Sequence, residues 1–250
     1  MKKAILLLLI SCSVSAQNFN FQRSWGTYFG DERFYLQDSK VDKQGNLYLV
    51  GYFLNGTSIS TPVFSTSNSY QSTFGGGASD GFIAKFNNLG QLTLATYFGG
   101  SDTDIVSGID IDASNNIYIV GSTSSTTNIA TANAYQTAIN GLSDFFIARF
   151  TPNGILNWSS YYGGTEGEGL DLNWISGGIN ENDTKLYVSH DKANNFYLSG
   201  YSDSPNMGTT GTFQPQQGQS NQIIAKFDNN GTNIWTTYHG SINPCYITAM

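Results

Sequence analysis

The stretch "TYFGGSDTD" (residues 96–104) returns in altered form three more times along the chain. "TYFG" stands at 27–30, "SYYGGTEGE" at 160–168 and "TYHGS" at 237–241. The first tyrosines of successive copies are 69, 64 and 77 residues apart. A period of this kind indicates an array of similar structural units, because each copy returns within the same larger context.

Three further phrases recur in fixed order between these copies. A turn that begins with aspartate leads into an apolar run and a glycine, as in "DASNNIYIVG" (112–121), with equivalents at 42–51 and 191–200. An aromatic-glutamine pair follows, at Tyr70-Gln71, Tyr135-Gln136 and Phe213-Gln214. The last phrase is "DFFIARFTPNG" (144–154), with equivalents at 80–90 and 221–231.

Each period contains four short segments rich in β-branched and aromatic residues, separated by Gly, Asn and Asp turns. This pattern predicts four antiparallel strands, A to D, in each repeat. Strand A is expected to end near Val41, Ile111 and His190, B to contain Tyr48, Tyr118 and Tyr197, C to cover Phe82 to Phe86, and D to cover Leu92 to Phe98 and their equivalents. No stretch shows an amphipathic helical period. Segments such as "IYIV" are apolar on both faces, which suits a small sheet packed between two like sheets, as in a propeller blade.

The set "TYFGGSDTD", "NNIYIVGST", "AYQ" and "DFFIARFTPNG" resembles the bacterial β-propeller repeats called SBBP repeats. The resemblance extends over about residues 24–240. It implies a propeller on a secreted or surface-exposed bacterial protein, often joined to further domains, and it implies no fixed enzymatic activity.

The predicted fold is an all-β propeller of four-stranded antiparallel blades. We expect blades at about 31–98, 99–162 and 163–240, with 241–250 starting a further one. The stretch "SWGTYFG" (24–30) matches a D strand and would belong to the last blade of a ring. Three blades are fewer than the usual four to eight. We therefore expect an incomplete ring that continues beyond Met250, or else one that closes by oligomerisation.

A glycine in each predicted C–D turn precedes a bulky D-strand residue by four positions. The pairs are Gly90 with Leu94, Gly154 with Trp158 and Gly231 with Trp235. Glycine permits the positive φ of a tight hairpin, and the bulky residue is expected to pack on the neighbouring blade.

The first sixteen residues read as a secretory signal peptide, since Lys2 and Lys3 precede the apolar run 4–10 and small residues reach Ala16. The segment is too short to span a bilayer, and no transmembrane segment is predicted. Alternatively, Cys12 becomes a lipidated N-terminus. Both interpretations predict a secreted or cell-surface protein, with 17–250 forming the propeller repeats.

The remaining chain is acidic and lightly charged. Without residues 1–16 it carries 9 basic and 18 acidic residues, which argues against nucleic acid as a partner. Only Cys245 would remain once Cys12 is removed, so no intrachain disulfide is expected.

The long connections of one face, B–C and D–A, are where binding residues are expected. In the third blade the D–A connection (164–185) is about fifteen residues longer than its counterparts. It is the first choice for contacts with a protein or glycan partner. The candidate residues are Glu166, Glu168, Asp171, Trp174, Glu181 and Asp183.

Acidic residues also follow the recurring phrase in every blade, and such hard oxygen ligands are suited to calcium. The candidates are Asp31, Glu32, Asp102, Asp104, Glu166 and Glu168. The alternative is that they lie in solvated turns. No cofactor other than calcium is expected. By contrast, Asp42, Asp112 and Asp191 are interpreted as turn formers that bond their own backbone.

Catalytic motifs are absent from the sequence, which has no nucleophile elbow, zinc-ligand spacing or phosphate loop. His190 and His239 replace apolar or aromatic residues of the other repeats and are interpreted as structural. The sequence thus predicts an exported propeller that acts as a scaffold for binding, adhesion or protein interaction. The alternatives are a propeller-type hydrolase or lyase acting on polysaccharide, with Glu166 and Glu168 as acid and base, and a structural spacer of a larger surface protein.

Overall fold

The computed structural model describes residues 25–27, 29–30, 33–56, 64–169, 186–217 and 222–240. These residues contain strands and turns and no helix. The strands are β1 (Phe34–Val41), β2 (Leu47–Leu54), β3 (Ser79–Phe86), β4 (Leu92–Phe98), β5 (Asp104–Ile111), β6 (Ile117–Thr123), β7 (Asp144–Phe150), β8 (Leu156–Tyr162), β9 (Tyr187–His190), β10 (Phe196–Tyr201), β11 (Gln222–Phe227) and β12 (Asn233–His239). They fall on the four segments predicted for each repeat.

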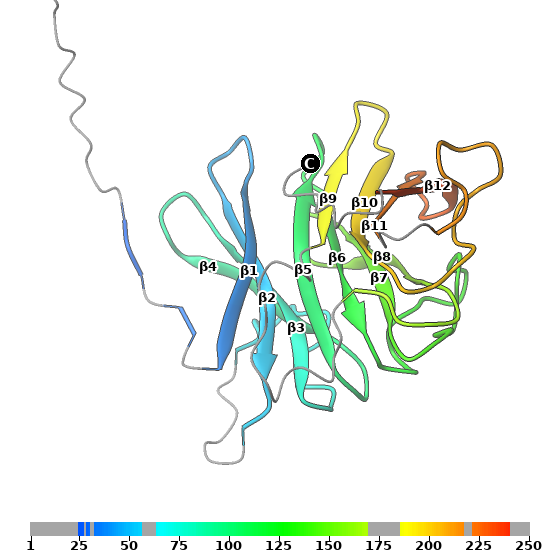
Figure 1. Ribbon diagram of the computed structural model, residues 1–250. Helices are drawn as coiled ribbons and strands as arrows, with labels where there is room; N and C mark the ends of the chain where they lie inside the picture. Colours follow the sequence, from blue (N-terminus) through cyan, green and yellow to red (C-terminus); the bar gives the residue numbers. More distant parts are fainter. Residues whose placement is uncertain are drawn as a thin grey trace, which may run out of the picture.

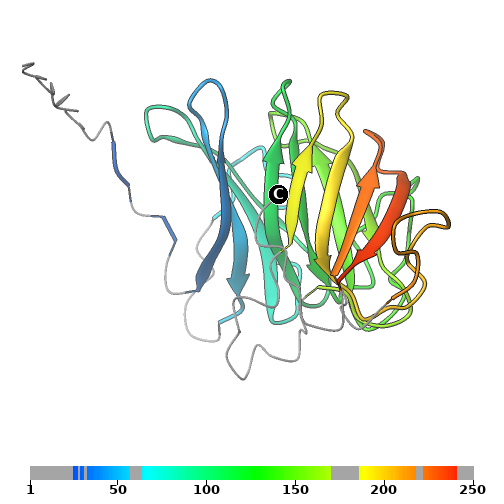
Figure 2. The same cartoon turned by 45° about the horizontal axis from the view of Figure 1, so that its top comes forward.

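The strands form three sheets of four, each with its strands in sequence order and antiparallel. The sheets are β1–β4, β5–β8 and β9–β12, and they stand beside one another like blades (Figure 1, Figure 2). Strand β5 packs against β1 on one side and β9 on the other, so the first strands of the three blades are neighbours. The predicted β-propeller architecture is confirmed. The described strands form an arc of three blades, and no closed ring is found among them.

The core lies between the blades because alternate side chains of each strand point to opposite faces. In β6, Ile117 and Ile119 belong to the core shared with the first blade, whereas Tyr118 and Val120 belong to the core shared with the third. All seven residues of β6 are buried. The middle blade therefore has an apolar contact on both faces, as "IYIV" predicted.

The N-terminal segment covers the outer face of the first blade. Trp25 and Phe29 pack against a core that contains Phe82 and Phe86. Residues 25–27 and 29–30 are nevertheless not a strand. A strand needs a hydrogen-bonded neighbour, and the described residues place no C strand beside this segment. The segment thus has the side-chain packing expected of a D strand but not the backbone hydrogen bonds to a neighbouring strand.

Each blade junction repeats one contact between a bulky side chain and a glycine. Trp25 lies over Gly90, Leu94 over Gly154 and Trp158 over Gly231, so that an added methyl group would meet the covering side chain at 2.7, 2.6 and 2.7 Å. The three glycines have φ of 76°, 80° and 82°. The predicted positive φ is confirmed at all three glycines, and the predicted packing onto the next blade is confirmed for Leu94 and Trp158. These contacts explain why the turn glycine and the bulky residue recur together.

The A–B turns are built around aspartate side chains, as predicted. Oδ1 of Asp112 accepts the N–H groups of Ser114 and Asn116 at 2.8 Å each, and Oδ2 accepts the Asn116 side chain at 2.7 Å. Asp42 and Asp191 do the same in the other blades. These aspartates are turn formers.

The connection between β8 and β9 is long, as predicted, and its described part forms isolated bridges at Gly167 and Glu168. Glu168 forms an antiparallel bridge with Ser202, in the register that pairs Asp104 with Thr123 in the second blade. The turn from Gly163 to Glu168 is therefore as long as the turn from Gly99 to Asp104. Residues 170–185 of this connection lie outside the described residues.

Candidate functional site

The B–C loops join β2 to β3, β6 to β7 and β10 to β11. Each folds back along the D strand of its own blade, which is β4, β8 or β12. Thr131 N–H donates to the Ser159 carbonyl at 2.9 Å, and Thr209 N–H donates to the Thr236 carbonyl at 2.8 Å. Thr66 forms the same bond with Ala95 in the first blade. The loops are thus fixed to rigid strands, on the edge of the blades opposite to the short A–B and C–D turns (Figure 2).

A glutamine in each loop fixes its end, which explains the aromatic-glutamine pair. Gln136 accepts the Gly163 N–H on Oε1 at 3.0 Å and donates from Nε2 to Oδ2 of Asp144 at 2.5 Å. Its carbonyl accepts the Tyr161 N–H at 3.1 Å. Gln71 makes the equivalent bonds at the first junction. The aromatic partner is left exposed on the surface, with Tyr135 at 54% of its maximum.

Two buried acidic pairs lie behind these glutamines. Asp80 of β3 lies near Asp104 of β5, and Asp144 of β7 lies near Glu168. All four side chains are completely buried. A methyl group on Gly99 would lie 2.7 Å from Oδ1 of Asp80 and 2.8 Å from Oδ2 of Asp104. A methyl group on Gly163 would lie 2.4 Å from Oδ1 of Asp144 and 2.4 Å from Oε2 of Glu168. The carboxylate groups of each pair therefore lie against a glycine of the recurring phrase, Gly99 or Gly163.

Neutral donors surround the second acid of each pair. Asp104 accepts the Gly100 N–H at 2.7 Å, the Ser125 hydroxyl at 2.8 Å and the Thr123 hydroxyl. Glu168 accepts the Gly164 N–H and the Ser202 hydroxyl, both at 3.0 Å. The Oδ1 atoms of Asp80 and Asp144, in contrast, have no hydrogen-bond partner among the described residues. A buried acceptor without a donor is costly, and a proton on Oδ1 would remove that cost.

Burial sets the titration of these groups. It raises the pKa of Asp80 to about 7 and of Asp104 to about 6, against hydrogen bonds that lower both. Burial also raises the pKa of Asp144 to about 7, with the charge of Glu168 adding to the increase, and it raises the pKa of Glu168. Two acids with so little solvent cannot both ionise without cost. We therefore expect each pair to hold a proton at mildly acidic pH.

The structure separates the acidic residues that the sequence placed together. Asp102 and Glu166 are exposed, whereas Asp104 and Glu168 are buried. Among the described residues no group of three His, Cys, Asp or Glu side chains is placed to hold a metal ion. Calcium binding stays a prediction. The other predicted positions, Asp31, Glu32, Asp171, Trp174, Glu181 and Asp183, lie outside the described residues.

Hollows lie between the blades beside the glutamine loops. The larger, about 1000 Å³, lies between the second and third blades. Its described lining contains no charged residue and includes Tyr135, Thr137, Asn140, Tyr162, Asn206 and Asn233. A smaller hollow of about 390 Å³ occupies the equivalent place between the first two blades and includes Tyr70, Gln71 and Asn128. Sequence reasoning found the aromatic-glutamine pair but did not assign it to a cavity.

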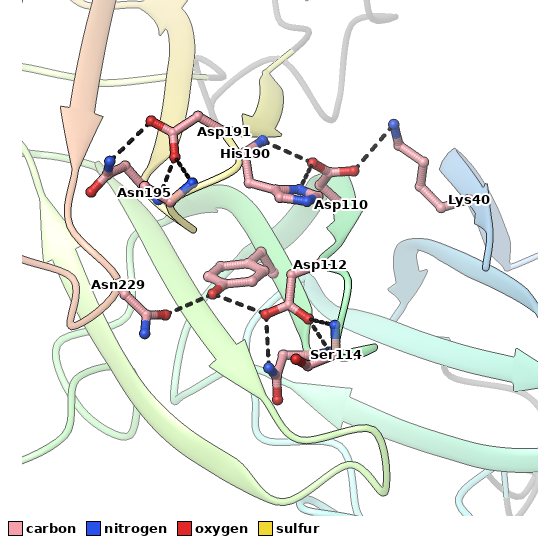
Figure 3. A network of polar contacts seen from close by, with 11 residues as sticks. Lys40, Asp110, Asp112, Ser114, His190, Asp191, Asn195 and Asn229 are labelled. Atoms are coloured by element: carbon pink, nitrogen blue, oxygen red, sulfur yellow. Dashed lines mark hydrogen bonds and ion pairs between the residues drawn. The ribbon is translucent and has the colours of Figure 1, made fainter. Parts of the chain in front are cut away.

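A polar network joins the first strands of the three blades (Figure 3). Asp110 of β5 forms an ion pair with Lys40 of β1 at 3.3 Å. It also accepts the backbone N–H of His190 in β9 at 3.0 Å and contacts its Nδ1 at 2.5 Å. His190 therefore connects two blades, in agreement with its structural interpretation.

One comparison with known proteins, that with family models, agrees with this architecture. A family model described as "SBBP: Beta-propeller repeat" matches residues 95–129. The chain contains an SBBP-type β-propeller repeat. The match includes "TYFGGSDTD" and "NNIYIVGST", so the predicted resemblance is confirmed. No curated protein matches the chain.

A solved structure of a protein of unknown function from Dyadobacter fermentans DSM 18053 is similar, with a TM-score of 0.40 and 9% sequence identity. The similarity covers 79% of this chain and 48% of the other, so the chain spans about half of that protein's length. Within the residues described, no helix has the length and apolar character needed to cross a membrane.

Proposed function

We propose that the chain is an exported propeller scaffold that binds its ligand through the B–C loops. The observation that carries this proposal is the hollow of about 1000 Å³ between the second and third blades. Binding pockets are commonly concave and largely formed before the ligand arrives.

The way the loops are held supports a preformed site. The Tyr162 hydroxyl is hydrogen-bonded to the Thr236 hydroxyl across the junction. The Asn233 side chain donates to the carbonyls of Lys226 and Trp235 at 3.3 Å each. Walls of this kind lose little conformational entropy on binding, which favours affinity.

Export and a surface location form part of the proposal. Their support is the signal-like sequence of residues 1–16, which lies outside the described residues. A repeated blade with repeated hollows also suits an adhesion role, because several weak sites on one scaffold act together.

Binding is favoured over hydrolysis by the position of the acids. A general acid or base must reach the substrate. Glu168 is completely buried and Glu166 is exposed, and neither is among the described residues that line the larger hollow.

The test is an array printed with neutral oligosaccharides, anionic polysaccharides, peptides, collagen and fibrinogen, probed with labelled protein. Thr137→Trp places a bulky ring in the larger hollow. Thr232→Trp is the matched control, because Thr232 is an exposed threonine in a C–D turn on the opposite edge.

We expect at least one class of ligand to be retained by the wild type and by Thr232→Trp and to be lost by Thr137→Trp. Equal binding by both variants, or no binding by the wild type, would overturn the proposal.

A further inference from the structure

No charged side chain lies among the described lining of the larger hollow between the second and third blades, although the protein as a whole is acidic. None of its described lining residues is Asp, Glu, Lys, Arg or His. An ionised ligand that enters such a site loses hydration without gaining an opposite charge, and this is unfavourable. The lining therefore selects against phosphates, carboxylates and basic peptides. A neutral ligand that forms many hydrogen bonds remains.

An aromatic platform lies at the mouth of the hollow. Tyr135 is 54% exposed, and its ring centroid lies 6.3 Å from that of Tyr162 at an interplanar angle of 47°. Tyr162 is 5% exposed, so it supports the outer ring from below. A tyrosine held in this way offers an apolar face to a ligand. The apolar face of a sugar ring has the shape to lie on it.

Polar side chains around the platform are available for hydrogen bonds. Asn140 and Asn206 are exposed, and their side-chain amides make no hydrogen bond within the described structure. Thr137 is also exposed, and its hydroxyl makes no hydrogen bond within the described structure. An amide group both donates and accepts, as does a hydroxyl. These are the partners that a ligand carrying many hydroxyl groups requires.

The hollow recurs one blade away. Between the first and second blades, Tyr70 is 41% exposed, stacks on Phe98 at 6.1 Å, and lines the smaller hollow with Asn128. Phe213 occupies the corresponding position of the third blade and is 86% exposed. Repeated aromatic platforms on one edge of a rigid arc suit a polymer that contacts more than one of them.

We propose that the hollow lined by Tyr135, Asn140 and Asn206 is a subsite for a neutral polysaccharide chain, a ligand class that rests on the proposed binding function. A sugar ring lies on Tyr135, and its hydroxyl groups bond the two asparagines. The smaller hollow at Tyr70 takes a second segment of the same chain.

Isothermal titration calorimetry on the full chain tests the proposal with cellohexaose, maltohexaose and chitohexaose as neutral probes. Hexagalacturonate is the anionic comparison. Tyr135→Ala removes the platform. Tyr35→Ala is the matched control, because Tyr35 is 43% exposed and stacks on Tyr52 at 4.9 Å, away from either hollow.

We expect one or more neutral hexasaccharides to bind, with hexagalacturonate at least tenfold weaker. Tyr135→Ala should weaken the binding at least tenfold, and Tyr35→Ala less than twofold. Thr137→Trp, which adds bulk instead of removing it, should also abolish binding. Circular dichroism melting of each variant separates lost binding from lost folding.

The proposal is overturned if no neutral hexasaccharide binds with a Kd below 10 mM, or if Tyr135→Ala binds as well as the wild type. If no neutral hexasaccharide binds but Thr137→Trp abolishes the binding of a protein or an anionic ligand on the array, the saccharide inference fails and the scaffold function stands. If Thr137→Trp loses nothing on the array, both fail.

Discussion

Replacing Asp144 by asparagine should stabilise the protein at neutral pH. Oδ2 of Asp144 accepts from Gln136 and Asn140, and an asparagine oxygen can accept the same bonds. Oδ1 has no donor among the described residues and faces Glu168, and the asparagine NH₂ group would donate there. The chain itself has Asn221 at the corresponding position of the third repeat, where "SNQI" replaces "SDFF". Asp144→Asn thus copies the protonated acid.

The expected magnitude follows from the pKa of Asp144, which burial raises from 3.8 to about 7. A raised folded-state pKa contributes stability that is complete below about pH 4 and is lost as the pH rises through about 7. One pKa unit corresponds to about 1.4 kcal/mol, so full ionisation at this junction costs on the order of 2–4 kcal/mol. Asp80 and Asp104 follow the same rule at the first junction.

Urea unfolding at pH 4.5 and pH 7.5 measures the effect. The wild type should lose stability between these values, and Asp144→Asn should lose less, since one of the buried acids no longer titrates while Glu168 still does. At pH 7.5 the variant should exceed the wild type by about 1–3 kcal/mol. The control Lys43→Gln changes an exposed charge in an A–B turn, on the opposite edge of the blades, and should keep the wild-type loss of stability between the two pH values. A variant with unchanged pH dependence, or one less stable than the wild type at pH 7.5, would refute the reasoning.

Four further substitutions test the blade junctions by thermal and urea unfolding. Trp158→Ala should lower the free energy of unfolding by about 3 kcal/mol. It removes the ring that packs on Gly231 and stacks on Phe196 at 5.7 Å, and it removes the indole hydrogen bond of 3.1 Å to the Asn229 carbonyl. Trp235→Ala, whose ring contact is within its own blade, should cost under half as much, and equal losses would contradict the packing. Gly163→Ala should cost about 1–3 kcal/mol through its clash with the buried acids, and a neutral result would show that the acids do not close over it. Asp110→Ala should cost about 1–3 kcal/mol by leaving a His190 N–H unbonded, and a loss below 0.5 kcal/mol would remove the network as a blade connection.

The repeating architecture was predictable because its determinants are local. The turn aspartates bond their own backbone within four residues, as Asp112 does with Ser114 and Asn116. The glycines of the C–D turns need positive φ, and strand faces follow from alternation. None of these features depends on which distant strand is the neighbour.

The acidic pairs were not predictable from spacing. Asp102 and Asp104 are two residues apart and looked like one ligand group. Hydrogen bonding instead fixes Asp102 in an exposed turn, while Asp104 begins β5 and turns inward to Asp80 of the preceding blade. A pairing between blades needs the fold before it can be seen. The serine-aspartate pair at the start of strand C, at Ser79-Asp80 and Ser143-Asp144, was the available signal.

The insertion of the third blade shows a related limit. The length of the connection between β8 and β9 was visible in the sequence. The bridge between Glu168 and Ser202 was not, because it depends on a hydrogen-bond register that no local phrase gives.

The central claim is that ligand binding resides at the B–C loop edge, between the second and third blades. The most direct measurement is an amide chemical-shift map of the isotope-labelled chain during titration with the tightest ligand of the array. The account predicts that the largest shifts fall at Tyr135, Asn140 and Asn206, with the A–B turns at 112–116 and 191–195 unaffected. Shifts concentrated at those turns instead would contradict it.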